Sequence, residues 1–128
     1  WHTPRKSGTH RVKKNMKIEV TKCNWTPATD DEVGELSFEA NTPKGVFKWH
    51  EELPRTGESE ESCEKNAWMN GVPVKLEEVD DYPEFSFPCN PSEKKKKRIQ
   101  DTLAQEIEEA LNEWAYYVSE IDLPTAAA

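Results

Sequence analysis

The sequence predicts an α+β fold in which an antiparallel sheet of about four or five short strands packs against one long C-terminal helix. Two observations predict this fold. Up to about residue 89, apolar residues recur at every second position, which is typical of strands with one buried face. From about residue 91 they recur at every third or fourth position, which is typical of an amphipathic helix. Elements with one apolar face each bury those faces together, so we expect two layers.

The first three strands follow from the alternation of apolar and polar residues. We expect them at residues 16–21, 35–40 and 46–51, with a loop at residues 26–31 after the first. Residues 41–45 read Asn-Thr-Pro-Lys-Gly, which is typical of a turn because proline fixes φ and glycine allows positive φ. The second and third strands are therefore predicted to form a hairpin with a five-residue turn.

The later strands are shorter and less regular. Residues 72–77 predict a strand in which Pro73 lies at the start or on a sheet edge, because proline donates no hydrogen bond to a neighbouring strand. Phe85 and Phe87 suggest one further short strand. Residues 53–66 are polar and aperiodic, so we expect a long loop, and residues 67–70 fit either a strand or a turn.

The helix is expected at about residues 91–120. It begins at Asn90-Pro91-Ser92-Glu93, with Asn90 as the N-cap and Pro91 at the first helical position. Its apolar stripe consists of Ile99, Leu103, Ile107, Leu111, Trp114, Val118 and Ile121. A helix of this length extends beyond a small sheet, and the excess allows a homodimer through the C-terminal helix.

The 128 residues suit a single domain, expected at residues 16–123. Residues 1–15 contain five basic residues, no acid and no apolar period, so we interpret them as a disordered basic arm or a non-native leader. Residues 124–128 form a tail. Removing the five bases of the arm from the 17 in the chain leaves 12 bases against 25 acids, a net charge of −13. This charge repels phosphate backbones, so nucleic acid is only a weakly supported partner.

Membrane and secretory features are absent from the sequence. No apolar run approaches the roughly 18–20 residues that span a bilayer. The basic N-terminus lacks the apolar region of a signal peptide. The three cysteines, Cys23, Cys63 and Cys89, are too few and too scattered for a disulfide framework. We therefore expect no membrane partner and a cytoplasmic location.

Charged clusters and two tryptophans are the candidates for partner binding. A basic run at the start of the helix opposes the helix dipole, which favours anions there. Either it is simply solvated, or it binds an acidic partner, a nucleic-acid backbone or the protein's own acidic loop. Trp25 and Trp68 fall near predicted loops, where each is either partly exposed, as at protein–protein hot spots, or packed over the sheet edge. The residues predicted to contact a partner are Lys94, Lys95, Lys96, Lys97, Arg98, Glu77, Glu78, Asp80, Asp81, Trp25 and Trp68.

Catalytic and cofactor chemistry has little support. The chain contains no GxSxG, P-loop or GxGxxG motif and no pair of histidines or cysteines at metal-binding spacing. His50 and Glu51 are neighbours on a predicted strand, so their side chains point to opposite faces and do not converge on a substrate. We predict no catalytic residue, no metal site and no cofactor.

The sequence thus favours a small acidic, non-enzymatic accessory protein that acts by binding an unidentified protein. Its size and composition resemble those of bacterial or phage accessory factors. One alternative is a nucleic-acid mimic or nucleic-acid-associated factor, in which carboxylates take the place of phosphates. A second alternative is a small-ligand-binding or hydrolytic domain with a pocket beneath the helix.

Overall fold

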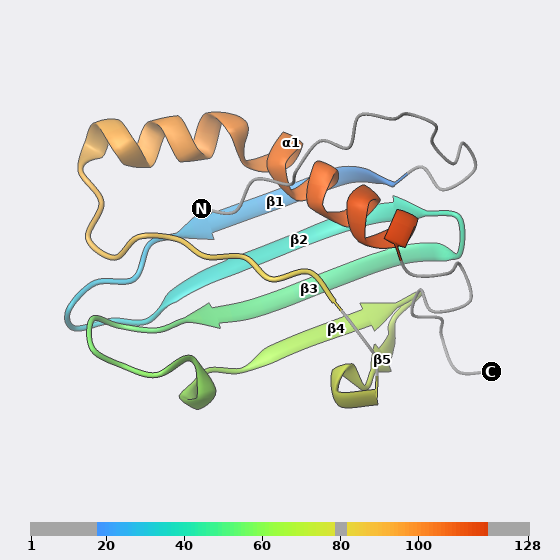
Figure 1. Ribbon diagram of the computed structural model, residues 1–128, viewed down its shortest axis with the longest axis horizontal. Helices are drawn as coiled ribbons and strands as arrows, with labels where there is room; N and C mark the ends of the chain where they lie inside the picture. Colours follow the sequence, from blue (N-terminus) through green and yellow to red (C-terminus); the bar gives the residue numbers. More distant parts are fainter. Residues whose placement is uncertain (1–17, 79–81, 118–128) are drawn as a thin grey trace.

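The computed structural model of the protein describes residues 18–78 and 82–117. Five antiparallel strands form one sheet in which each strand pairs with the next along the chain, and one long helix packs on one face (Figure 1). The predicted α+β fold class is confirmed. Residues 1–15, Met16, Asp80, Asp81, Val118, Ile121 and residues 124–128 lie outside the described residues. The elements are β1 (Glu19–Thr26), β2 (Gly34–Thr42), β3 (Gly45–Leu53), β4 (Lys65–Met69), β5 (Val72–Val74), the short 3-10 turns η1 (Glu60–Ser62) and η2 (Leu76–Glu78), and α1 (Glu93–Tyr117).

The hairpin of β2 and β3 is confirmed, but its turn is shorter than predicted. Thr42 pairs with Gly45, so only Pro43 and Lys44 connect the strands. Gly45 extends the ladder because it adopts φ +135°, a conformation that other residues rarely reach. The Thr42 hydroxyl accepts a hydrogen bond from the Lys44 N–H at 3.0 Å and donates one to the Gly45 carbonyl at 2.9 Å. These two hydrogen bonds hold a connection of two residues in place of the predicted five-residue turn.

β1 continues to Thr26, so the prediction that the first strand ends at residue 21 was wrong. The cause is an irregularity at Thr21: Val20 pairs with Ala40 and Lys22 with Glu39, which leaves Thr21 as an extra residue. A bulge of this kind reverses the alternation of side chains. The even-numbered residues face the core before Thr21 and the odd-numbered ones after it, which hides the second half of the strand from a simple period-two pattern.

The fourth and fifth strands also differ from the prediction. β4 occupies part of the region expected to be a loop, and β5 is a short edge strand that contains Pro73, as expected. Phe85 and Phe87 do not form a strand. Their segment lies between Pro83 and Pro88, which lack the N–H that a ladder needs. It crosses the sheet without regular secondary structure, on the side of α1 (Figure 1).

The helix begins two residues later than predicted, because Ser92 and not Asn90 is its N-cap. The Ser92 hydroxyl accepts a hydrogen bond from the Lys95 N–H at 3.1 Å. Asn90 adopts φ +48° and belongs to the preceding turn. Its N–H donates to the Ala28 carbonyl at 2.9 Å, and its side-chain amide donates to Asp30 at 2.9 Å. Asn90 therefore ties the start of α1 to the loop that follows β1.

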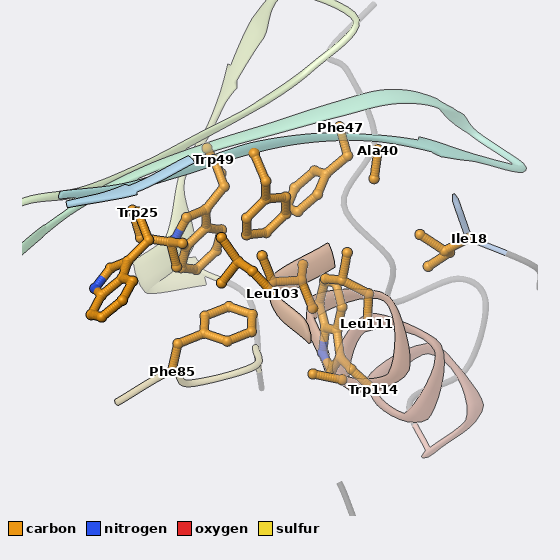
Figure 2. Close-up of a cluster of buried hydrophobic side chains, with 14 of the residues drawn as sticks. Ile18, Trp25, Ala40, Phe47, Trp49, Phe85, Leu103, Leu111 and Trp114 are labelled. Carbon is orange, nitrogen blue, oxygen red and sulfur yellow. The ribbon is translucent and has the colours of Figure 1, made fainter. Parts of the chain in front are cut away.

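The core lies between α1 and the face of the sheet that we call the inner face (Figure 2). Phe47 and Trp49 point from β3 toward the helix, and Phe85 closes the core from the irregular segment. The Phe47 and Trp114 rings lie 6.3 Å apart between centroids, which joins sheet to helix. The helical residues that the core buries are Ile99, Leu103, Ile107, Ala110, Leu111 and Trp114. The residues that alternate with the buried ones point to the other face, the outer face, and are exposed or half-buried.

Candidate functional site

One row of outer-face residues crosses all five strands. Lys22 of β1 pairs with Glu39 of β2, Glu39 with Lys48 of β3, Lys48 with Trp68 of β4, and Trp68 with Pro73 of β5. Residues that pair across antiparallel strands project from the same face of a sheet. The five side chains therefore form a continuous line across the surface that α1 leaves uncovered.

The charged half of this row has two lysines for one carboxylate. The Glu39 carboxylate lies 3.5 Å from the Lys22 Nζ and 3.8 Å from the Lys48 Nζ. The lysine side chains are 79% and 54% exposed, whereas that of Glu39 is only 21% exposed. Exposed ion pairs of this kind contribute little to stability. Their consequence here is electrostatic: the row keeps one positive charge in excess on a strongly acidic protein.

The other half of the row is apolar. Trp68 is half-buried and lies between Lys48 and Pro73. Val46 is 37% exposed and precedes Lys48 by two residues on β3, so it is a diagonal neighbour of Trp68 on the same face. A shallow groove of about 330 Å³ runs over the middle of the face and includes Trp68 in its lining. We call this surface the outer-face patch; it consists of Lys22, Glu39, Val46, Lys48, Trp68 and Pro73.

The Trp25 side chain, by contrast, is buried and forms no part of the outer-face patch. It is 3% exposed and stacks on Phe87 with 5.1 Å between ring centroids. Of the two alternatives for Trp25, packing holds and partial exposure does not, because the irregularity at Thr21 turns this part of β1 so that Trp25 faces inward. Trp68 is partly exposed, the other of the two alternatives. Of the two tryptophans, only Trp68 is placed to touch a partner.

The basic run does not meet Glu77 and Glu78, the acidic candidates among the residues that the structure describes. Lys94, Lys95, Lys97 and Arg98 are exposed on the first turns of α1, and Lys96 is half-buried. Within the described part of the chain, the ion pair that the run makes joins Lys97 to Asp101 at 3.8 Å. Glu77 and Glu78 are exposed in η2, beyond β5 and far from the start of α1 (Figure 1). Their role in partner binding, and that of the basic run, stays a prediction.

A buried carboxylate was not among the sequence predictions. Glu51 lies on the inner face of β3 and is 5% exposed. Its Oε1 accepts a hydrogen bond from the Trp49 indole N–H at 3.0 Å. Burial raises the pKa of Glu51, an effect that this hydrogen bond and the charge of Lys65 partly offset. The signal was present in the sequence, since Glu51 shares the inward phase of Phe47, Trp49 and Leu53.

His50 does not combine with Glu51, as its position on the strand predicted. It points to the outer face, where its Nε2 lies 3.5 Å from a Glu35 carboxylate oxygen. Within residues 18–78 and 82–117, no cluster of three or more histidine, cysteine or acidic side chains is arranged to hold a metal ion. In the same residues, no helix is both long enough and apolar enough to cross a membrane.

Comparison with known proteins adds no assignment: no protein-family model, curated protein or solved structure matches the chain. The outer-face patch and the surroundings of Glu51 are therefore the features from which a function can be inferred.

Proposed function

We propose that the protein is a non-enzymatic accessory protein that binds another protein through the outer-face patch. The observation that carries this proposal is that α1 covers one face of the sheet only, while the uncovered face holds a tryptophan in a shallow groove. Tryptophan is enriched at the centres of protein–protein interfaces, where it buries a large area at small entropic cost. Trp68 is the anchor that we expect in this interface.

The patch also indicates the chemistry of the partner. Val46, Trp68 and Pro73 offer apolar contact, and the excess positive charge of Lys22 and Lys48 lies beside them. A complementary surface presents an apolar side chain next to a carboxylate. We favour a protein over nucleic acid because the negative charge of the whole chain opposes a phosphate backbone, and two surface lysines offset little of it.

The experiment compares two exposed valines. The protein is immobilised as wild type, as Val46→Lys and as Val33→Lys, and retained proteins from a lysate of its source cells are quantified by mass spectrometry. Val33 is 41% exposed and lies outside the patch, so Val33→Lys introduces the same charge at a matched level of exposure. We expect Val46→Lys to lose a protein that wild type and Val33→Lys retain. Trp68→Ala, checked for folding by circular dichroism, is expected to lose the same protein.

Other results would overturn the proposal. If every retained protein binds the Val46→Lys variant as well as wild type, the patch is not the interface. If charge reversal at Lys94–Arg98 removes the partner instead, the basic run binds it. If the protein retains nucleic acid in a salt-dependent manner and no specific protein, the nucleic-acid alternative replaces the protein partner.

A further inference from the structure

A small cavity lies on the inner side of the sheet, at the end of the molecule opposite the β2–β3 turn. It has a volume of about 80 Å³ and is enclosed by the end of β3, the loop around η1, the start of β4 and residues 85–89. Since a water molecule needs about 10–15 Å³ of such space, the cavity holds several waters or the end of one side chain. It shares no residue with the outer-face patch, so any role of the cavity is independent of the proposed function.

The walls of the cavity divide into two kinds. Phe85, Phe87 and Pro88 provide apolar contact on one side. Glu51 and Glu60 contribute two carboxylates against the one ammonium of Lys65, so the lining is negative on balance and a positive charge that enters is favoured. A ligand with a short apolar stem and a cationic end matches both kinds of wall.

The buried carboxylate gives the cavity a specific point of attachment. One oxygen of Glu51 is occupied by the Trp49 indole, whereas the other accepts no hydrogen bond from any residue in the described part of the chain. A buried carboxylate without a counter-ion is costly, because the interior replaces the hydration it loses only poorly. The same burial raises the pKa of Glu51, as do the nearby carboxylates of Glu60 and Glu84.

Lys65 is the internal cation nearest to this carboxylate, but it does not neutralise it by direct contact. It pairs in register with Glu51 across β3 and β4. Its Nζ lies over the ring of Tyr82, 5.5 Å from the centroid, and no ion pair within 4 Å joins it to Glu51 among the described residues. Lys65 therefore contributes a long-range attraction and leaves the second oxygen of Glu51 open to a ligand.

We infer that the cavity binds the cationic end of an arginine or lysine side chain presented by another protein. The charged end hydrogen-bonds to the open oxygen of Glu51, and the aliphatic stem packs between Phe85 and Phe87. The exposed carboxylate of Glu60, which also lines the cavity, raises the local concentration of basic segments. This site would give the protein a second contact, on the opposite side of the sheet from Trp68.

The test is an NMR titration of the wild-type protein with n-butylguanidinium. The reporter is the Trp49 indole N–H, assigned with Trp49→Phe, because it donates to the same carboxylate. We expect a saturable shift with n-butylguanidinium and n-butylammonium, and none with the neutral n-butyramide. A blocked Gly-Arg-Gly peptide is expected to produce the same shift. If n-butylguanidinium shifts the resonance but the peptide does not, the site takes a free amine or guanidine and the assignment to a protein side chain is wrong.

Glu51→Gln removes the charge and keeps an acceptor for the Trp49 indole. We expect it to weaken binding of n-butylguanidinium at least about tenfold, which corresponds to about 1.4 kcal/mol. The matched control is Glu61→Gln, an exposed carboxylate of η1 outside the cavity, which should bind as wild type does.

Binding by the wild type should also fall as pH is lowered and Glu51 is protonated. The other titratable residues that line the cavity or act on the charge of Glu51 are Glu52, Glu60, Glu84, Lys65, Cys63 and Cys89. Equal binding of the cation and of n-butyramide, or equal binding by wild type and Glu51→Gln, would overturn the inference.

Discussion

The Asn112 side chain of α1 pairs with the backbone of Ile18 in the way that a neighbouring strand would. Its Oδ1 accepts a hydrogen bond from the Ile18 N–H at 2.9 Å, and its Nδ2 donates to the Ile18 carbonyl at 2.9 Å. Glu108 adds a third bond by accepting from the Val20 N–H at 3.0 Å. β1 is an edge strand, and edge strands expose unpaired backbone groups. The helix thus satisfies the start of this edge and fixes its own position over it.

Asn112→Ala is expected to destabilise the protein by about 2 kcal/mol, because it leaves two backbone groups of a buried residue, Ile18, without partners. The measurement is the free energy of unfolding from urea denaturation. Gln100→Ala, at an exposed position of the same helix, serves as control and should change it by less than about 0.5 kcal/mol. Equal stability of the two variants would mean that packing alone holds α1 in place.

Glu51→Gln should change how stability depends on pH. The pKa of Glu51 is raised in the folded protein above its ordinary value of 4.5, so the folded state binds more protons than the unfolded state between the two values. Protonation of Glu51 therefore stabilises the folded wild type. This stabilisation is fully present below pH 4.5 and is lost as pH rises through the pKa that Glu51 has in the folded protein.

Glu51→Gln removes this loss, so its stability relative to wild type should increase from acidic to neutral pH. Urea denaturation of both proteins at a series of pH values measures the difference. A difference that is constant with pH would show that Glu51 titrates in the folded state as it does in the unfolded one.

Gly34 is expected to tolerate no side chain. A methyl group there would lie 2.5 Å from the Thr26 carbonyl oxygen and 2.6 Å from the Ala28 backbone nitrogen, where the chain turns back after β1. Because both contacts are with backbone, Gly34→Ala should cost about 1–3 kcal/mol or more through overpacking. Gly57→Ala meets no atom within 4 Å, although Gly57 has φ +82°, so it isolates the smaller conformational cost. Thermal unfolding of the two variants tests whether Gly34→Ala is the less stable one. A higher melting temperature for Gly34→Ala than for Gly57→Ala would contradict this prediction.

Much of the fold could be predicted, because most elements have one buried face and their apolar residues recur at the spacing typical of a strand or a helix. Leu36, Phe38 and Ala40 are buried along β2, and Ile99, Leu103 and the rest of the helical stripe up to Trp114 are buried as their spacing predicts. The failures have local causes. In β4 the small Ala67 faces the core and the large Trp68 faces outward, so the apolar pattern does not show which face is buried. Phe85 and Phe87 alternate like a strand, but the prolines around them prevent pairing.

The sites were harder to predict than the fold. Trp68 was a candidate from the sequence, but its neighbours on the surface come from four other strands and depend on registers that a single sequence does not reveal. The alternation along the strand separates Glu51 from His50, but a carboxylate on the buried face runs against the usual preference for apolar residues there, so Glu51 was not a candidate. The cavity beside it forms only when residues 85–89 cross the sheet, which is a tertiary contact without a local signal.

The most direct test of the proposed function is photo-crosslinking in the source cells. A photoreactive amino acid replaces Val46 in one version of the protein and Val33 in another, since both valines are exposed and only Val46 belongs to the outer-face patch. We predict a discrete covalent product with one protein from position 46 and none from position 33. The absence of a product from position 46, or the same product from both positions, would contradict the proposal that the outer face binds a partner.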